Sequence, residues 1–132
     1  MVLHRDAEGD LGAIYEVDEE AAADIDAFLE EASNNQETLD NLTRRGYVNH
    51  DAEPPYSVSE WERLKRESYN LWRAKLLWLK GTSDYRIIYA FHPREFRYYV
   101  LGVLHRDFNY DIRDERSKRI VAAYDALDIP RY

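Results

Sequence analysis

The sequence predicts an α+β fold: an N-terminal helical hairpin packed on a curved, mainly antiparallel β-meander sheet, and a C-terminal helix. Three observations lead to this prediction. Apolar residues recur with helical spacing between residues 17 and 45, three apolar runs with strand spacing follow between residues 71 and 110, and helical spacing returns after residue 111. At 132 residues, the chain is long enough for a single domain with one core.

The first half of the chain is dominated by two predicted helices. Residues 2–15 are compatible with an opening strand, although glycines and scattered acids make it a poor one. A helix over 17–33 is clearer, because apolar residues share one stripe and acids occupy its first turn. A second helix over 36–45 ends at Gly46 and completes an antiparallel hairpin. The apolar stripes comprise Val17, Ala21, Ile25, Phe28, Leu29 and Ala32 in the first helix and Leu39 and Leu42 in the second.

Residues 47–56 are predicted to form a connector that leads into a short helix. Pro54-Pro55 excludes a continued helix, because proline lacks the backbone N–H and its ring clashes with the preceding turn. Ser57-Val58-Ser59-Glu60 has the spacing of a capping box, which predicts a helix from there to about Glu67. The inward residues of this helix are Trp61 and Leu64.

Three strands and a closing helix complete the predicted fold. The strands are 72–80, 85–92 and 96–104, with turns at 81–84 and 93–95 between them. In the first strand, apolar residues, including Trp78, alternate with Arg73 and Lys75, so that one face is core and the other is partly wet. In the third strand, both sets of alternating positions are apolar, so that both faces are apolar, which is typical of a central strand. A helix over 111–127 follows, with Ile120, Tyr124 and Leu127 inward, and the residues expected to be buried elsewhere include Phe28, Leu29, Leu39, Trp72 and Val100.

Composition excludes several classes of function. The absence of cysteine removes disulfides, thiol catalysis and zinc fingers together. His4, His50 and His92 show no metal-ligand spacing, and no glycine-rich phosphate loop is present, so neither a metal nor a cofactor is expected. A mean hydropathy of −0.70 without a long apolar run predicts no membrane span. The first residues lack an apolar signal core, and we therefore expect a cytoplasmic protein.

Charge is distributed unevenly along the chain. Residues 1–53 contain 3 basic and 15 acidic residues, a net charge of −12, whereas residues 54–132 contain 15 basic and 11 acidic residues, a net charge of +4. The total of −8 argues against nucleic-acid binding, but a local basic surface matters more than total charge for binding a polyanion. An acidic helix that merely keeps the protein soluble explains the first half but leaves the clustered bases of the second half unexplained.

Cationic side chains recur at one edge of the predicted sheet. Arg73, Lys75, Arg86, His105 and Arg106 are far apart along the chain, yet a three-stranded meander can bring them to one surface. A cluster of this kind, without metal or thiol chemistry, suits an anionic ligand whose charge must be stabilised. RNA is the leading candidate.

Three segments of the predicted sheet carry recognisable motifs: Trp72-Arg73-Ala74-Lys75-Leu76, Asp84-Tyr85-Arg86-Ile87-Ile88-Tyr89 and Val100-Leu101-Gly102-Val103-Leu104-His105-Arg106. Together they resemble the RelE/ParE superfamily of toxins, which includes the HigB-like mRNA interferases. The family reads roughly aromatic-R-x-K-L, then G/D-Y-R-I/L-x-Y, then V-x-x-V-x-K/H-R, and the middle motif is the most specific. The resemblance covers about residues 60–120. It implies a RelE-like fold, a cognate antitoxin as partner, and mRNA on the ribosome as substrate.

The resemblance also implies roles for individual cations. Arg73 and Lys75 match basic residues of the family, and together with Lys80 they would bind RNA. Arg86 matches the strand arginine and Arg106 matches the arginine after the last strand. Both would stabilise negative charge on the scissile phosphate, because a planar guanidinium holds phosphate through two hydrogen bonds and stays charged.

Proton transfer in such a reaction requires a further group. The 2′-hydroxyl must lose a proton, attack the adjacent phosphate and expel the 5′-oxygen. His105 titrates near neutral pH and stands where many family members have lysine. The family often has a catalytic tyrosine shortly after the arginine that Arg106 matches. Ile112 aligns with that tyrosine, and Tyr110 is the nearest substitute, with a possible role in stacking on a base or orienting the nucleophile.

Three functions are compatible with the sequence. The first is a metal-independent endoribonuclease toxin of a type II toxin–antitoxin system that cleaves mRNA and inhibits translation. The second is a ParE-like toxin that acts on DNA gyrase by protein contact and lacks the catalytic set. The third is a non-catalytic interaction protein with the RelE fold, which the negative net charge and the missing aligned tyrosine favour. The presence of Arg86 together with the His105-Arg106 pair favours the nuclease.

Overall fold

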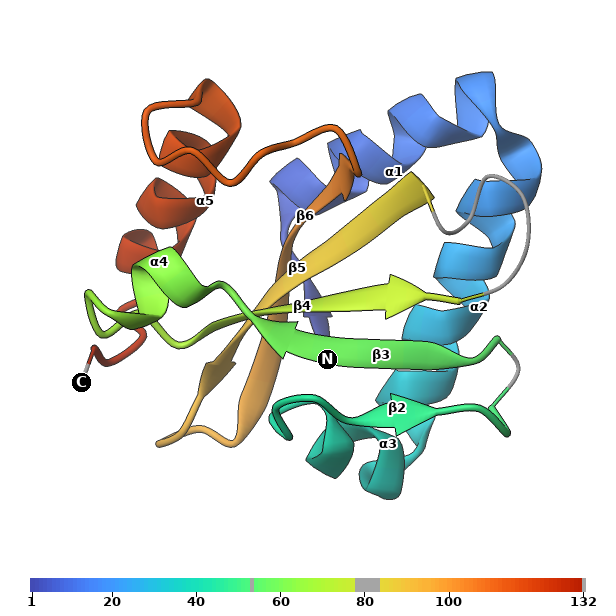
Figure 1. Cartoon of the computed structure of the whole chain (residues 1–132), viewed down its shortest axis with the longest axis horizontal. Helices are drawn as coiled ribbons and strands as arrows, with labels where there is room; N and C mark the ends of the chain where they lie inside the picture. Colours follow the sequence, from blue (N-terminus) through green and yellow to red (C-terminus); the bar gives the residue numbers. More distant parts are fainter. Residues whose placement is uncertain (53, 78–83, 132) are drawn as a thin grey trace.

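The protein forms a six-stranded mixed sheet with helices on both faces (Figure 1). The computed structural model describes residues 1–52, 54–77 and 84–131. The strands are β1 (Val2–Leu3), β2 (Val48–Asn49), β3 (Tyr56–Glu60), β4 (Leu71–Leu76), β5 (Tyr85–His92) and β6 (Arg97–His105). Their order in the sheet is β1-β6-β5-β4-β3-β2. β1 runs parallel to β6, and every other neighbouring pair is antiparallel.

The helices cover the two faces unequally. They are α1 (Arg5–Val17), α2 (Glu19–Asn34), α3 (Gln36–Asn41), α4 (Glu62–Lys65) and α5 (Glu115–Ala126). Buried residues of α1 and α2 form one core with Trp72, Ala74 and Tyr89 of the sheet. Buried residues of α4 and α5 form a second core with Ile88 and Ala90 on the opposite face. The α+β class is therefore confirmed.

The N-terminal segment differs from the predicted strand. Only Val2–Leu3 is a strand, and Arg5–Val17 is a helix. Ala7, Leu11 and Ile14 are buried at helical spacing, and the His4 side chain caps the helix by accepting the Asp6 N–H at 3.1 Å. Of the acids that weakened the strand pattern, Glu8 is exposed, whereas Asp6 and Asp10 face the Arg119 side chain. The opening strand over 2–15 was therefore wrong beyond its first residues.

The helical hairpin also begins earlier than predicted. Asp18 ends α1 and caps α2, because its backbone N–H donates to the Ile14 carbonyl while its carboxylate accepts the Ala21 N–H. α1 and α2 are thus successive helices, and the predicted second helix over 36–45 is reduced to the six residues of α3. Leu42 is buried as expected, whereas Leu39 is only partly buried.

The predicted helix over 57–67 is mostly wrong. Tyr56–Glu60 is a strand that pairs with β4, and only Glu62–Lys65 is helical. Tyr56 and Val58 alternate with two serines, which is a strand period, and long-range pairing outweighs the short capping-box match. The connector predicted over 47–56 contains the short strand β2 and the start of β3. Trp61 and Leu64 are buried as expected.

The meander and the last helix follow the sequence closely. β5 has the predicted bounds, and β6 is displaced by one residue. β4 ends at Leu76. Trp78, Lys80 and most of the predicted turn at 81–84 lie outside the described residues. α5 begins later than predicted because the Asp114 side chain caps it by accepting the Arg116 N–H at 2.8 Å. Phe28, Leu29, Trp72, Val100, Ile120 and Tyr124 are buried as expected, and Leu127 is partly buried.

Two contacts lock the far edge of the sheet. β1 pairs with β6 only at Tyr99 and Val100, and beyond this point the Asp10 carboxylate accepts the Val103 N–H at 3.0 Å. The same carboxylate receives two hydrogen bonds from the Arg119 guanidinium, at 3.0 and 2.6 Å. Asp10 therefore supplies the hydrogen-bond acceptor for an edge N–H of β6 and joins α1 to α5.

None of the helices that the structure describes has the length and apolar character needed to cross a membrane.

Candidate anion-binding face

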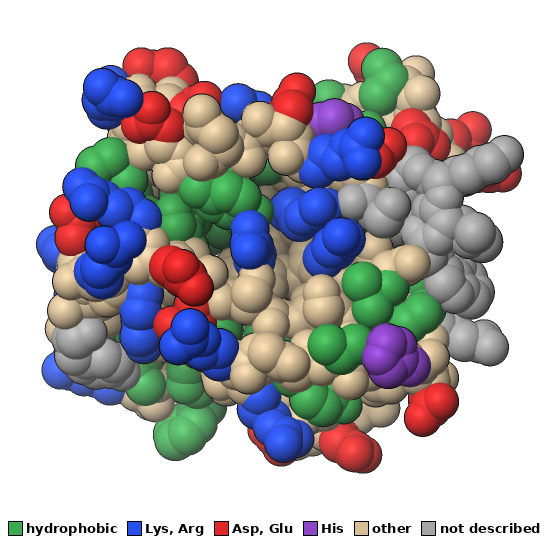
Figure 2. All heavy atoms as spheres, in the orientation of Figure 1, with side chains coloured by type: hydrophobic (Ala, Val, Ile, Leu, Met, Phe, Trp, Pro, Cys, Tyr) green, Lys and Arg blue, Asp and Glu red, His purple; other side chains and the backbone are tan. Residues whose placement is uncertain are grey.

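Three cations lie on adjacent strands of the sheet, on the face that carries α4 and α5. The register pairs Lys75 with Arg86, and Arg73 with Ile88, whose side chain is in the second core. Directly opposed residues of antiparallel strands project to the same face, with Cβ atoms roughly 5 Å apart. We call Arg73, Lys75 and Arg86 the cationic face. Figure 2 shows basic side chains gathered over the middle of the sheet, in a part that the helices leave open.

Arg86 is the half-buried centre of this face. Burial lowers the pKa of its guanidinium, and the positive charges of Arg73 and Arg106 lower it further. Tyr110 and Asp84 act in the opposite direction. An arginine remains charged despite such a shift. Arg73 and Arg106 therefore lie close enough to Arg86 for their positive charges to act on it.

Arg73 is held in place from two sides. Its Nε donates a hydrogen bond to the Ser59 hydroxyl on the neighbouring strand β3. Its guanidinium carbon lies 4.9 Å from the centre of the Tyr110 ring, which is cation–π distance. These contacts orient the charged group and leave Arg73 half-buried rather than freely mobile in solvent.

Arg106 lies at the end of the cationic face, directly after the Tyr85–His105 pair of β5 and β6. Its backbone N–H donates to the Asp84 carbonyl at 2.6 Å, and its Nε lies 3.3 Å from the Asp84 carboxylate. The Arg106 side chain is 64% exposed, so this ion pair is well solvated and contributes little to stability. An incoming phosphate can therefore compete with Asp84 for this guanidinium at modest cost.

Tyr110 joins the cationic face through an aromatic cluster. Its ring lies 5.2 Å from Trp61 and 4.7 Å from Phe108, measured between ring centres. Its backbone has a φ of 61°, a left-handed conformation that is costly for a residue other than glycine. Its buried hydroxyl makes no hydrogen bond within the described structure. A hollow of about 290 Å³ beside this ring is lined partly by Trp61, Arg63, Arg66, Arg73 and Tyr110.

His105 does not share the cationic face. It pairs with Tyr85, one position along from the Arg86–Leu104 pair, and successive side chains of a strand point to opposite faces. The Tyr85 ring packs on the first core and lies 5.5 Å from the His105 ring. The His105 Nδ1 accepts the Asp107 N–H at 3.2 Å, and its side chain is 43% exposed. Of the predicted group, the structure brings Arg73, Lys75, Arg86, Arg106 and Tyr110 together and separates His105, while Lys80 lies outside the described residues.

Sequence reasoning missed the residues that support this face. Ser59 and Trp61 were assigned to a helix, although the alternation in Tyr-Ser-Val-Ser-Glu was the signal for a strand beside Arg73. Phe108 had no motif to mark it. Among the ranges 1–52, 54–77 and 84–131, no group of three His, Asp or Glu side chains is arranged to hold a metal ion.

Comparisons with known proteins give no family to which this arrangement can be assigned. No family model, no curated protein and no solved structure matches the chain.

Proposed function

We propose that the protein is a cytoplasmic RelE-like toxin of a type II toxin–antitoxin system, a metal-independent endoribonuclease that cleaves mRNA on the ribosome. The observation that carries this proposal is the juxtaposition of Arg73, Lys75 and Arg86 on a sheet face that the helices leave open. Arg106 adds a fourth charge near enough to lower the pKa of Arg86. The motif resemblance of the same strands supports the family, and a cognate antitoxin would cover this face.

The proposed chemistry depends mainly on electrostatic stabilisation. Attack of the ribose 2′-oxygen on the adjacent phosphate increases the negative charge on the phosphoryl oxygens. Arg86 and Arg106 are the two guanidinium groups best suited to stabilise that charge, since each can donate two parallel hydrogen bonds. Arg73 and Lys75 would hold the neighbouring backbone phosphates, and the Tyr110 ring would contact a base.

The position of His105 bears on proton transfer. Because its side chain points to the opposite face from Arg86, His105 is poorly placed to reach the phosphate in this conformation. The Tyr110 ring lies beside Arg73 on the cationic face, which favours Tyr110 over His105 for contact with the bound RNA.

Induced expression followed by mapping of mRNA 5′ ends tests the proposal. We expect Arg86→Ala or Arg106→Ala to slow cleavage by about 10²-fold or more, the scale of losing one preorganised donor to a developing oxyanion. Arg86→Lys should recover part of the loss, because lysine supplies charge without the guanidinium fork. Arg94→Ala is the matched control, because Arg94 is an exposed arginine in the turn between β5 and β6.

A second candidate is a ParE-like toxin that acts on DNA gyrase. The separation of His105 from the cationic face favours it, because that activity requires no proton-transfer group. If Arg86→Ala and Arg106→Ala, both folded by circular dichroism, remain fully toxic, the nuclease proposal is wrong. Inhibition of gyrase supercoiling by the purified protein would then support the second candidate.

A further inference from the structure

A hollow of about 290 Å³ adjoins the cationic face on the side of α4. Arg73 and Tyr110 form one part of its wall, and Arg63 and Arg66 of the α4 segment form another. The volume is near the lower end of the range for small-ligand sites, which suits one nucleobase. Arg63 and Arg66 therefore extend the positive charge of the proposed RNA site beyond the three residues of the cationic face.

The two arginines of α4 are available to an anion. They are three positions apart, so that both lie on one side of the helical turn, and both are exposed. Within the part of the chain that the structure describes, neither Arg63 nor Arg66 forms an ion pair. Arg113, by contrast, is held by the Asp111 carboxylate at 3.1 Å. The guanidinium donors of Arg63 and Arg66 can therefore bind a phosphate without first leaving a carboxylate.

Two acids also line the hollow, but they leave it with a surplus of positive charge. Glu62 lies 3.6 Å from Arg45, an exposed cation outside the described wall of the hollow. Glu60 pairs with Trp72, whose side chain is in the first core, so that the Glu60 side chain projects away from the face that carries Arg73.

The Arg73–Tyr110 pair offers a preformed surface for a base. The Arg73 guanidinium lies over the Tyr110 ring at 4.9 Å and donates to the Ser59 hydroxyl, so that its position is fixed before a ligand arrives. Trp61 supports the Tyr110 ring from the core, with 5.2 Å between the ring centres. Arg73 and Tyr110 are both half-buried, which leaves part of each exposed. Unpaired bases of RNA stack on such aromatic rings and guanidinium planes.

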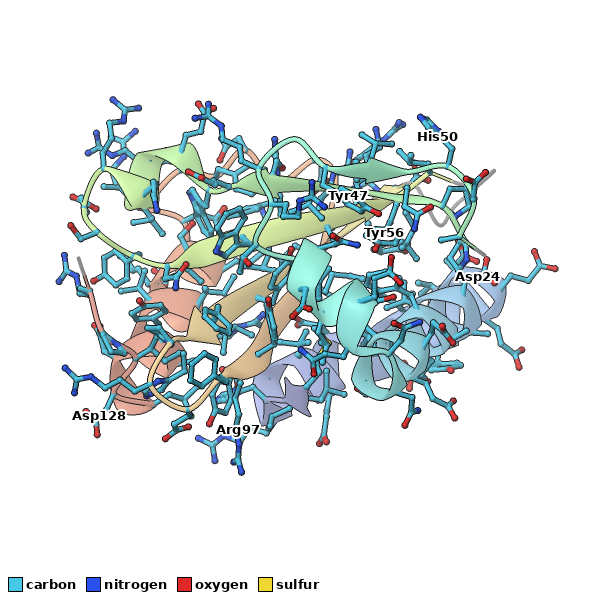
Figure 3. The ribbon with its side chains drawn as sticks, turned by 90° about the horizontal axis from the view of Figure 1, so that it is seen from below. Asp24, Tyr47, His50, Tyr56, Arg97 and Asp128 are labelled. Atoms are coloured by element: carbon cyan, nitrogen blue, oxygen red, sulfur yellow. The ribbon has the colours of Figure 1, made fainter. Side chains whose placement is uncertain are left out.

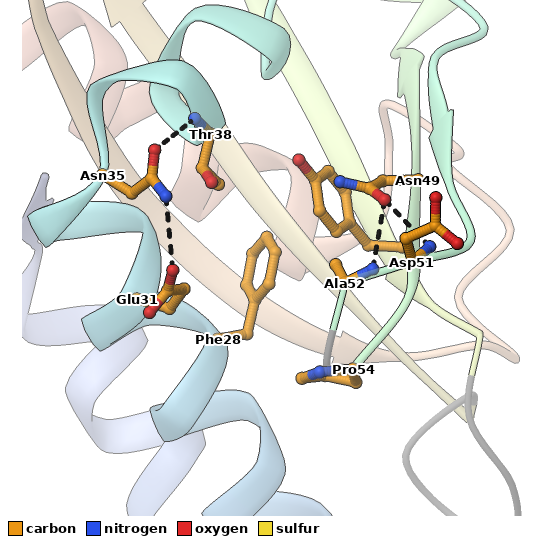
Figure 4. A pocket seen from close by; sticks show the side chains of 9 residues that line it. Phe28, Glu31, Asn35, Thr38, Asn49, Asp51, Ala52 and Pro54 are labelled. Atoms are coloured by element: carbon orange, nitrogen blue, oxygen red, sulfur yellow. Dashed lines mark hydrogen bonds between the residues drawn. The ribbon is translucent and has the colours of Figure 1, made fainter.

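The opposite side of the sheet has a pocket of opposite charge. This pocket, of about 470 Å³, lies between α2, the start of α3 and the connection from β2 to β3, and Glu31 and Asp51 flank it (Figure 4). None of the described residues that line it is basic. Tyr56 of its wall, labelled in Figure 3, belongs to the first core. With a net charge of −12 on residues 1–53, this side repels a polyanion, which leaves the α4 side for RNA.

We propose that the hollow beside α4 is a subsite for one unpaired nucleotide of an RNA single strand, next to the phosphate at Arg86. The base packs on the Arg73–Tyr110 pair, and the phosphate of this nucleotide accepts hydrogen bonds from Arg63 and Arg66. The subsite rests on the proposed function, because it shares Arg73 with the cationic face. In a duplex the base is already paired and stacked, so the ligand class is single-stranded RNA.

Binding of a strand that cannot be cleaved tests the phosphate contact. The probe is a fluorescein-labelled hexamer of 2′-O-methyluridine, whose blocked 2′-oxygen cannot attack the phosphate, and its anisotropy is measured between about 50 and 200 mM salt. Replacing both arginines (Arg63→Ala with Arg66→Ala) should raise Kd by about tenfold at the lowest salt, the scale of losing a charge-assisted hydrogen bond. The slope of log Kd against log salt should fall by about 0.7, the value for one phosphate of a single strand. The matched control is Lys65→Ala, which removes an exposed charge of the same helix outside the described wall and should leave Kd and slope unchanged.

A strand without bases tests the base contact. An abasic hexamer of the same backbone keeps the number of phosphates, and the wild-type protein should bind it at least about fivefold more weakly, the lower end of the effect of one stacked base. Tyr110→Leu should lose this difference and keep the wild-type salt slope, whereas Tyr110→Phe should retain both. Because Arg63 and Arg66 are exposed, the test of the phosphate contact does not depend on the folding of the Tyr110 variants.

Three outcomes would overturn the subsite: an unchanged salt slope in the double arginine variant, equal affinity for the abasic strand, or equal displacement of the probe by a hexaglutamate peptide. The last would assign the hollow to an acidic polypeptide. If the wild-type protein shows the expected binding but cleaves no mRNA, the ribonuclease proposal is wrong and the subsite stands. If the wild-type protein cleaves mRNA and the double arginine variant has the same kcat/KM, the subsite is wrong and the ribonuclease proposal stands.

Discussion

The contact between Asp10 and Arg119 makes the sharpest prediction about stability. The Asp10 side chain is 16% exposed and accepts three hydrogen bonds, one from the Val103 N–H and two from Arg119. Asp10→Ala would leave a strand-edge N–H without its partner and a guanidinium that is only 34% exposed without its main counter-ion. Removing one partner of a fully buried pair costs about 3–5 kcal/mol. Since this pair is partly solvated, we expect a loss of about 2–3 kcal/mol.

Urea unfolding followed by tryptophan fluorescence measures this loss, with an unchanged m-value as the check that both states are comparable. The corresponding fall in Tm is about 6–10 °C for a domain of this size. Asp6→Asn is the control, because Asp6 lies 4.0 Å from the Arg119 Nε and forms no hydrogen bond with it. It should cost less than about 1 kcal/mol. A loss below about 0.5 kcal/mol for Asp10→Ala would refute the role assigned to this contact.

Three further predictions concern the backbone and the buried tyrosines. Gly46→Ala should destabilise the protein by about 1 kcal/mol, because Gly46 has a φ of 75°. Gly9→Ala should instead stabilise α1 by about 0.5–1 kcal/mol, because open space surrounds that helical position. If the denaturant midpoints of the two variants shift in the same direction, this reasoning is wrong. Tyr89→Phe should cost about 1–2 kcal/mol in urea, since the hydroxyl donates to the Leu42 carbonyl at 2.6 Å. Burial raises the pKa of Tyr89 well above its unfolded value of about 10. The contribution of Tyr89 to the free energy of unfolding should therefore be constant below that pH and fall as the pH rises above it, so that the total fall at alkaline pH is smaller in Tyr89→Phe.

The meander was predictable because its signal is local. Strand alternation around Arg73 and Lys75, and the run of apolar residues in β5 and β6, are complete within short windows of sequence. The same windows place Arg86 on the correct strand. The N-terminal helix was missed because Gly9 and Gly12 lower helix propensity, and packing of Leu11 and Ile14 on β6 outweighs that cost.

The site was only partly predictable, because successive residues of a strand point to opposite faces, and the pairing between strands decides which face each residue occupies. His105 and Arg106 are neighbours in sequence, yet the register of Tyr85 with His105 sends their side chains in opposite directions. A bulge between Ile88 and Tyr89 also shifts the register along the same pair of strands. Such shifts arise from contacts between strands and have no signature in one strand alone.

The parallel pairing of β1 with β6 has a consequence for the order of folding. Val2 pairs with Tyr99, so this contact must close a loop that spans residues 2–99, whereas β5 and β6 are joined by a short turn. Closing a long loop costs more entropy and becomes favourable only after the rest of the sheet is ordered. During synthesis, β1 therefore leaves the ribosome before Tyr99 and Val100 are available to pair with it. Pulsed hydrogen exchange should therefore find the His4 N–H, which donates to the Val100 carbonyl, protected later than the amides between β5 and β6.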